Sequence, residues 1–173
     1  MNRSSDSQPS RARHADRSTY DRALDLLETR ARSVVELRRA LIKKGEPAAA
    51  VDAAVERLRG AGLLDDASYA RQLARSKALG PGQSRRRIAQ ELARRGVARD
   101  LGDKAIAEVF EDEGVDESAN IERVARKKMK TLAKLDSLTQ RRRLYAFLAR
   151  RGYDGEAISR IVGRLTGDET SAE

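Results

Sequence analysis

The chain has 173 residues, of which 39% are hydrophobic and 36% are charged, and it carries a formal net charge of +9. It has no cysteine for disulfides, no apolar run near the roughly 18 residues of a membrane helix and no apolar leader segment, so we expect a soluble cytoplasmic protein. The positive charge predicts attraction to nucleic acid or to an acidic protein surface.

The two ends of the chain differ from its middle. Residues 1–19 are rich in Ser, Arg and Asp and almost free of apolar side chains, which predicts a disordered tail. Residues 168–173 form a short acidic tail. Residues 20–167 show helical periodicity and no convincing strand, so the predicted fold class is all-α.

A helix-end pattern occurs three times between these tails. The sequence LRRALIKKG at 37–45 recurs as IAQELARRG at 88–96 and as LYAFLARRG at 144–152. In each copy two apolar residues stand four apart, which places them on one helix face, and two basic residues precede a glycine. The glycine is typical of a left-handed residue after a helix, and the cations suit the negative end of the helix dipole.

Each helix-end pattern lies between two further amphipathic segments, so each copy reads as three helices. The stripes after the glycines are Val51, Val55 and Leu58, then Gly102, Ile106 and Val109, then Ile158, Val162 and Leu165. Gly102 is the one break. We therefore predict three imperfect tandem repeats at 20–64, 65–115 and 116–167, stacked in an elongated array. A generic helical bundle is the alternative.

Most of the excess positive charge falls in the third repeat, which has 13 basic and 6 acidic residues. On its second helix Arg143 and Arg150 are seven apart, with Arg142 beside them, and Arg86, Arg87 and Arg94 repeat this layout in the second repeat. We predict a basic stripe that binds a phosphate backbone or an acidic groove. A solvated helix face is the alternative. The candidate residues are Arg86, Arg87, Arg94, Arg95, Arg126, Lys127, Lys128, Lys130, Arg142, Arg143, Arg150 and Arg151.

The aromatic residues do not look available for stacking on bases. Tyr69, Phe110, Tyr145, Phe147 and Tyr153 fall in or near apolar stripes, so we expect most of them in the core. Contact with nucleic acid would then be mainly electrostatic and weakly sequence-specific.

The junction between the first two repeats reads GLLDDASYA at 62–70. Asp65 or Asp66 is expected to cap the next helix rather than to bind a metal, because no third ligand lies nearby. This junction, the turn at 80–82 (GPG) and the pattern from Ile88 to Gly96 resemble the RecX regulatory family over roughly residues 20–165. The resemblance implies three tandem three-helix repeats in an extended, curved molecule.

The resemblance also implies a function. RecX proteins bind the RecA–DNA filament and mainly inhibit the ATPase, coprotease and strand-exchange activities of RecA, and some bind DNA. We expect no enzyme, no cofactor and no metal, because the chain has no phosphate-binding glycine loop and its single histidine, His14, lies in the tail. We also expect a monomer with no membrane contact. A general DNA- or RNA-binding helical protein and a pure protein scaffold are the competing classes.

Overall fold

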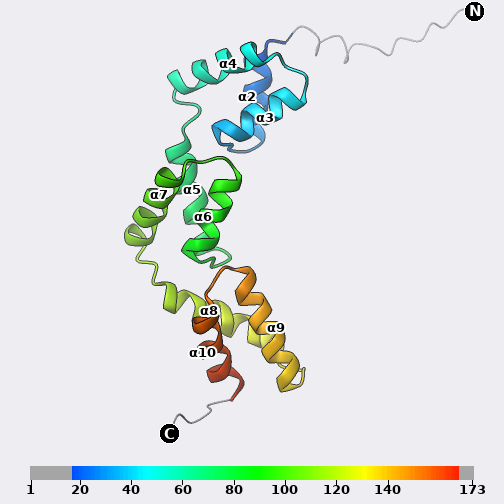
Figure 1. Ribbon diagram of the computed structural model, residues 1–173, viewed down its shortest axis with the longest axis vertical. Coiled ribbons are helices and arrows are strands. Elements are labelled where there is room, and N and C mark those ends of the chain that lie inside the picture. The colour runs from blue at the N-terminus through cyan, green and yellow to red at the C-terminus, as the bar shows by residue number, and fades with distance from the viewer. Residues whose placement is uncertain (1–16, 168–173) are drawn as a thin grey trace, which may run out of the picture. The chain divides into compact units, whose positions relative to one another are not determined.

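The computed structural model describes residues 17–167, so most of the expected N-terminal tail and all of the acidic tail lie outside the described residues. All regular structure in this range is α-helical, with no strand (Figure 1). In chain order the helices are α2 (Thr19–Thr29), α3 (Val34–Lys43), α4 (Ala48–Gly60), α5 (Asp66–Leu79), α6 (Arg85–Arg94), α7 (Arg99–Asp112), α8 (Glu117–Lys130), α9 (Ser137–Arg150) and α10 (Gly155–Thr166).

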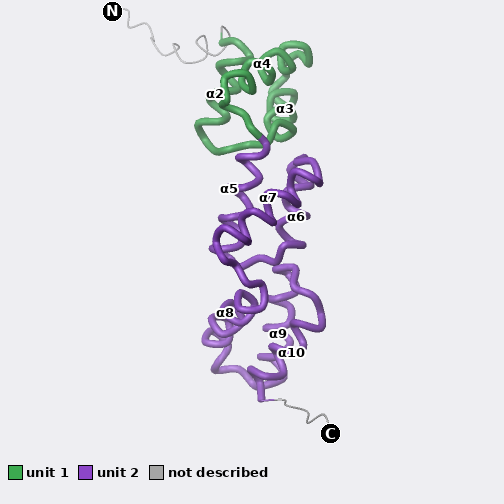
Figure 2. Tube along the Cα trace, turned by 90° about the vertical axis from the view of Figure 1, so that its left-hand side faces the viewer, with its two compact units in different colours: residues 1–65 green, residues 66–173 purple. Residues whose placement is uncertain are grey.

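The helices group into three triplets, and each triplet encloses its own core. The chain divides into two compact units, residues 1–65 and residues 66–173 (Figure 2). The first unit contains α2–α4, and the second contains α5–α7 and α8–α10, whose helices pack against one another within each triplet. The prediction of an all-α chain of three tandem three-helix repeats is confirmed. The elongated, curved arrangement concerns the placement of the units and stays a prediction.

The apolar stripes read from the sequence are the buried faces of the helices. The paired positions Leu37/Leu41, Ile88/Leu92 and Leu144/Leu148 are at most 1% exposed. Gly102, the break in the stripe, is buried on α7, and a Cβ added there would lie 3.4 Å from Leu92 Cδ1. The small residue therefore lets α7 approach α6 closely.

Each predicted helix-end glycine comes just after a helix, and the glycine itself adopts the left-handed backbone conformation. Gly45, Gly96 and Gly152 have φ values of 88°, 81° and 87°. An L-residue would be strained at such angles by about 1 kcal/mol. The three glycines therefore end α3, α6 and α9 in the same way, as predicted.

Serine side chains fix the beginnings of several helices. The Ser18 hydroxyl accepts a hydrogen bond from the Asp21 amide, and the Asp21 carboxylate accepts one from the Ser18 amide. The hydrogen bonds from Ser18 hold the pKa of Asp21 below its ordinary value. Because of this capping box, α2 begins at Thr19. An ion pair between Arg17 and Asp25 joins the preceding residue to the same helix. Residues 18 and 19, expected in the N-terminal tail, form the N-cap and the first residue of α2.

Candidate functional site

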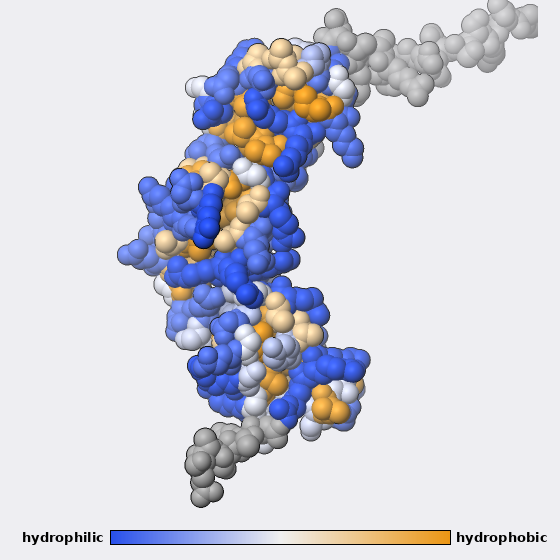
Figure 3. Space-filling view, viewed as in Figure 1, coloured by the Kyte–Doolittle hydropathy of each residue, from blue (hydrophilic) through white to orange (hydrophobic). Residues whose placement is uncertain are grey.

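The second helix of the third repeat, α9, carries three exposed arginines of the predicted stripe. Arg142, Arg143 and Arg150 are all exposed, as predicted from their offset from Leu144 and Leu148. None of the three pairs with a carboxylate of residues 17–167. Hydrophilic residues cover most of the visible face over the helices of this unit (Figure 3). The positive charges of Arg142, Arg143 and Arg150 are therefore not compensated by an ion pair within the described chain.

The equivalent arginines of α6 lie in a different place. Arg86 Nε donates to the Gly152 carbonyl oxygen at 3.1 Å, and Arg86 Nη2 donates to that of Tyr153 at 3.4 Å. Arg87 is half-buried, its Nε has no hydrogen-bond partner, and a Cβ on Gly152 would lie 2.5 Å from Arg87 Cβ. Both arginines belong to the contact between the second and third repeats.

Two further residues of the α6 stripe differ from each other. Arg94 is exposed and donates to the Gln90 carbonyl oxygen of its own helix at 3.3 Å. Arg95 is half-buried and donates to the Tyr69 hydroxyl at 2.9 Å and to Glu91 Oε1 at 2.7 Å. Burial raises the pKa of Glu91, but the hydrogen bonds from Arg95 and Lys77 outweigh it and lower the pKa overall. Arg95 therefore supports the core of the second repeat.

The basic residues on α8 also differ in whether they pair with a carboxylate. Arg126 pairs with Glu122 at 2.6 Å, and its hydrogen bond is the main reason that the pKa of Glu122 is lowered. Lys127 and Lys130 are exposed, and Lys128 is half-buried with its Nζ 5.5 Å from the centre of the Phe147 ring. Lys127, Lys128 and Lys130 have no carboxylate partner among residues 17–167.

The turn between α5 and α6 fastens the second repeat to the third. The Tyr153 hydroxyl donates to the Gly82 carbonyl oxygen at 2.9 Å, and Arg151 Nε donates to that of Pro81 at 2.8 Å. Asn120 Nδ2 donates to the Ala78 carbonyl oxygen at 3.3 Å. Burial raises the pKa of Tyr153 to about 12. The junction is thus a polar contact between turns and helix ends.

The same turn lines a pocket that the sequence analysis missed. Gly80 and Pro81 face α8 and α9 across a space of about 280 Å³. Its lining includes Arg123, which was not among the candidates, and Phe147, on which the Arg151 guanidinium stacks at 3.6 Å. The spacing of Arg123 and Lys127, four apart on one helix, was the signal available in the sequence.

The aromatic residues mostly lie in the core. Tyr69, Phe110 and Tyr153 are at most 7% exposed, as expected. Tyr145, by contrast, is 44% exposed, because it follows the core residue Leu144 and points about 100° away from it around the helix. Most of this set was expected in the core, and Tyr145 is the member that lies at the surface.

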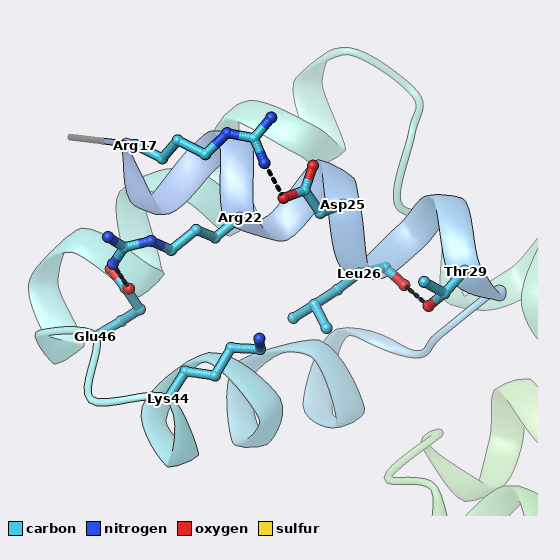
Figure 4. A pocket seen from close by; sticks show the side chains of 7 residues that line it. All are labelled: Arg17, Arg22, Asp25, Leu26, Thr29, Lys44 and Glu46. Carbon is cyan, nitrogen blue, oxygen red and sulfur yellow. Dashed lines mark hydrogen bonds and ion pairs between the residues drawn. The ribbon is translucent and has the colours of Figure 1, made fainter. Parts of the chain in front are cut away.

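The basic side chains that line a pocket in the first unit are mostly neutralised. Arg22 pairs with the buried Glu46, and Arg17 pairs with Asp25 (Figure 4). Hydrogen bonds from Thr19 and Arg22 lower the pKa of Glu46. Lys44 also lines this pocket, without a carboxylate partner within the described range. This pocket of mixed charge therefore has less attraction for an anion than the surfaces of the third repeat.

Residues 17–167 contain neither a cluster of metal ligands nor a helix suited to cross a membrane. Within residues 17–167, no three His, Cys, Asp or Glu side chains are placed to hold a metal ion. None of the helices in the same range is long and apolar enough to span a bilayer. The candidate site in the described chain is therefore the cationic surface of α8 and α9.

Comparison with known families agrees with the division into triplets. Models of the first, second and third three-helix domains of RecX match residues 20–58, 65–106 and 116–162. These ranges fall on α2–α4, α5–α7 and α8–α10. The chain belongs to the RecX family.

Relatives in the RecX family cover most of the chain. The regulatory protein RecX of Pelodictyon phaeoclathratiforme is 33% identical over 143 residues, which is 83% of this chain and 86% of the relative. That of Mycobacterium avium is 36% identical over 144 residues, covering 80% and 79%. These relatives are named as regulatory proteins.

Solved RecX structures share the fold. The crystal structure of RecX from Lactobacillus salivarius is similar with a TM-score of 0.65 at 17% identity, covering 85% of this chain and 94% of that one. A second crystal structure, of regulatory protein RecX, gives a TM-score of 0.66 at 22% identity, with coverages of 87% and 72%.

Proposed function

We propose that the protein regulates the RecA recombinase by binding the RecA–DNA filament, and that it mainly inhibits the ATPase, coprotease and strand-exchange activities of RecA. Membership of the RecX family carries this proposal. We further propose that it acts in the cytoplasm as a monomer and uses no cofactor.

The exposed arginines of α9 support a polyanionic partner. Arg142, Arg143 and Arg150 have no carboxylate partner in the described chain, whereas Arg126 on α8 is neutralised by Glu122. Uncompensated charge at a surface accelerates encounter with an oppositely charged partner and gives salt-dependent binding. The phosphate backbone of a nucleic acid and an acidic protein groove would both satisfy this requirement.

RecA activity in the presence of the protein tests the proposal directly. The DNA-dependent ATPase and strand exchange of RecA are titrated with the full chain, and we expect inhibition at substoichiometric amounts, because one bound regulator would block many subunits of a filament. DNA binding without RecA is measured in parallel at several salt concentrations.

The DNA-binding measurement distinguishes this proposal from a second candidate function, general DNA binding. The exposed arginines of α9 are compatible with that function too. A general helical DNA-binding protein would bind DNA tightly and leave RecA activity unchanged. That outcome would remove the RecA proposal and favour the alternative. A pure scaffold would change neither measurement.

A further inference from the structure

The pocket between the 80–81 turn, α8 and α9 has a charge that the described chain does not balance. Its lining contains four cations and no carboxylate. The cations are Arg123, Lys127, Lys128 and Arg151. None of them forms an ion pair with an acidic residue of 17–167, although Arg126 and Arg164 nearby both pair with Glu122, at 2.6 and 2.7 Å. Four positive charges that line one pocket without a counter-charge are an arrangement that attracts an anion.

Two of these cations are already held in place. Arg151 Nε donates to the Pro81 carbonyl oxygen, and the guanidinium stacks on the Phe147 ring, while its Nη groups bond to no atom of the described residues. Arg123 Nη2 donates to Asn120 Oδ1 at 2.6 Å. A guanidinium fixed in this way presents its remaining N–H donors to a ligand with little further loss of side-chain entropy.

The surroundings of Arg151 favour the arrival of an anion. Partial burial is the largest effect on the pKa of its guanidinium and lowers it, while Tyr153 raises the pKa and Arg150 lowers it by smaller amounts. Burial means that the charged form is less well solvated here than in water, and Arg150 adds repulsion between like charges. An anion in the pocket would offset this cost.

The helix dipole does not account for the whole cluster. Lys127 and Lys128 lie in the last turn of α8, where cations complement the partial negative charge of the helix end. Arg123 lies one turn earlier, and Arg151 comes from the end of α9. Arg151 complements the dipole of α9 in the same way, but Arg123 lies outside the last turn of either helix, so the helix dipoles do not explain its place in the cluster.

We propose that this pocket is a phosphate-binding site, in which Arg151 and Arg123 hold the phosphate oxygens and Lys127 and Lys128 add positive charge. A phosphate has several oxygens to accept from guanidinium donors and matches this number of cations better than a single carboxylate does. Its source is either a nucleic-acid backbone or free phosphate. The site does not depend on the RecA proposal.

The test compares two lysines of α8 in the full chain. Lys127→Gln removes a charge from the pocket lining, and Lys130→Gln removes the same charge from an exposed position of the same helix outside it. Binding of a labelled single-stranded oligonucleotide is followed by anisotropy, and binding of inorganic phosphate by amide NMR shifts, at about 0.1 M salt to screen the diffuse charge. No RecA is present, so the result is separate from the regulatory assay.

We expect Lys127→Gln to weaken binding about tenfold and Lys130→Gln less than about twofold. A selective loss for the oligonucleotide assigns the pocket to backbone phosphates, and a selective loss for inorganic phosphate assigns it to free phosphate. The shifts caused by phosphate should include the amides of Lys127 and Thr131. Equal losses in the two variants, or no binding of either ligand to the unmodified chain, would overturn the proposal.

Discussion

Gly152 joins two repeats because a left-handed backbone and a crowded environment coincide at one residue. Its φ is 87°, and an added Cβ would lie 2.5 Å from Arg87 Cβ and 2.6 Å from Ser84 Oγ. Its carbonyl accepts from Arg86, and the Ser84 amide donates to the carbonyl of Arg151 at 3.0 Å. A glycine that ends a helix thereby also forms the contact with the preceding repeat.

Replacement of Gly152 by alanine should be more costly than the backbone angle alone requires. We expect Gly152→Ala to lower the free energy of unfolding by about 2–4 kcal/mol, from backbone strain plus overpacking. Gly114→Ala is the matched control, since Gly114 also has a positive φ (58°) but has nothing within 4 Å of its Cβ position. It should lose about 1 kcal/mol. Urea denaturation followed by circular dichroism measures both, and equal losses would contradict the crowding argument.

Tyr153 makes the same junction sensitive to alkaline pH. Burial raises its pKa to about 12 from an ordinary value of 10.0, so the folded state holds the phenolic proton more tightly than the unfolded chain does. The stabilisation is therefore complete below pH 10 and is lost as the pH rises through about 12.

Tyr153→Phe tests this pH dependence, because it removes the phenol hydroxyl and its hydrogen bond to Gly82. At neutral pH we expect the variant to be less stable by about 1 kcal/mol, because the carbonyl oxygen of Gly82 loses its donor. The advantage of the unmodified chain should shrink as the pH rises above 10, measured as the difference in unfolding free energy between the two proteins. A constant difference over this range would show that the phenol does not titrate with the fold.

At the scale of the helix, α6 and α9 carry arginines in the same register but use them differently. Arg86 of α6 is exposed but donates to the turn around Gly152, and Arg87 is packed against that turn. By contrast, Arg142 and Arg143, the equivalent exposed residues of α9, pair with no carboxylate of residues 17–167. The two helices therefore share a sequence pattern but use it differently. The arginines at the start of α6 stabilise the contact with the third repeat, and those at the start of α9 are exposed.

A pair of alanine variants on α6 separates the two uses. Arg86→Ala should cost about 1–3 kcal/mol and speed hydrogen exchange in α8–α10, because two bonds between the repeats are lost. Arg94→Ala on the same helix should change stability by less than about 0.5 kcal/mol, since Arg94 is exposed and donates a hydrogen bond within its own helix. Unchanged exchange in the Arg86 variant would contradict a role in coupling the repeats.

For the whole molecule, the charge is spread unevenly over three similar repeats. The third repeat carries 13 basic and 6 acidic residues, while the second carries 10 and 9. Since each repeat uses the same three-helix scaffold, the difference lies in surface residues and not in the core. A surplus of this kind favours a polyanionic partner for the third repeat.

A double charge reversal on α9 tests this assignment. Arg142→Glu with Arg143→Glu should weaken binding to the RecA–DNA filament or to DNA by about tenfold or more and leave helicity unchanged, because both side chains are exposed. Arg39→Glu with Lys43→Glu on α3 makes the same change in net charge at exposed residues of the first unit and serves as the control, since Arg38 on that helix is paired with Asp52. If the control weakens binding equally, net charge rather than the α9 face is responsible, and unaltered affinity in the α9 variant would mean a merely solvated face.

The sequence by itself determined the local architecture, because its causes lie within a few residues. The four-residue spacing of Leu144 and Leu148 sets which side of α9 is buried, and a glycine after two basic residues ends the helix wherever the pattern occurs. The exposure of Arg142 and Arg143 follows from the same spacing. The all-α class and the three repeats could therefore be predicted.

Only the tertiary structure decided which arginines are available to a partner. Arg86 meets a carbonyl 66 residues further along the chain, and the pocket brings Arg123 and Arg151 together with the turn at 80–81. Periodicity within a helix indicates which residues share a face, but it does not indicate what lies against that face. That is set by packing between repeats, where side chains distant in sequence compete for the same hydrogen bonds and space.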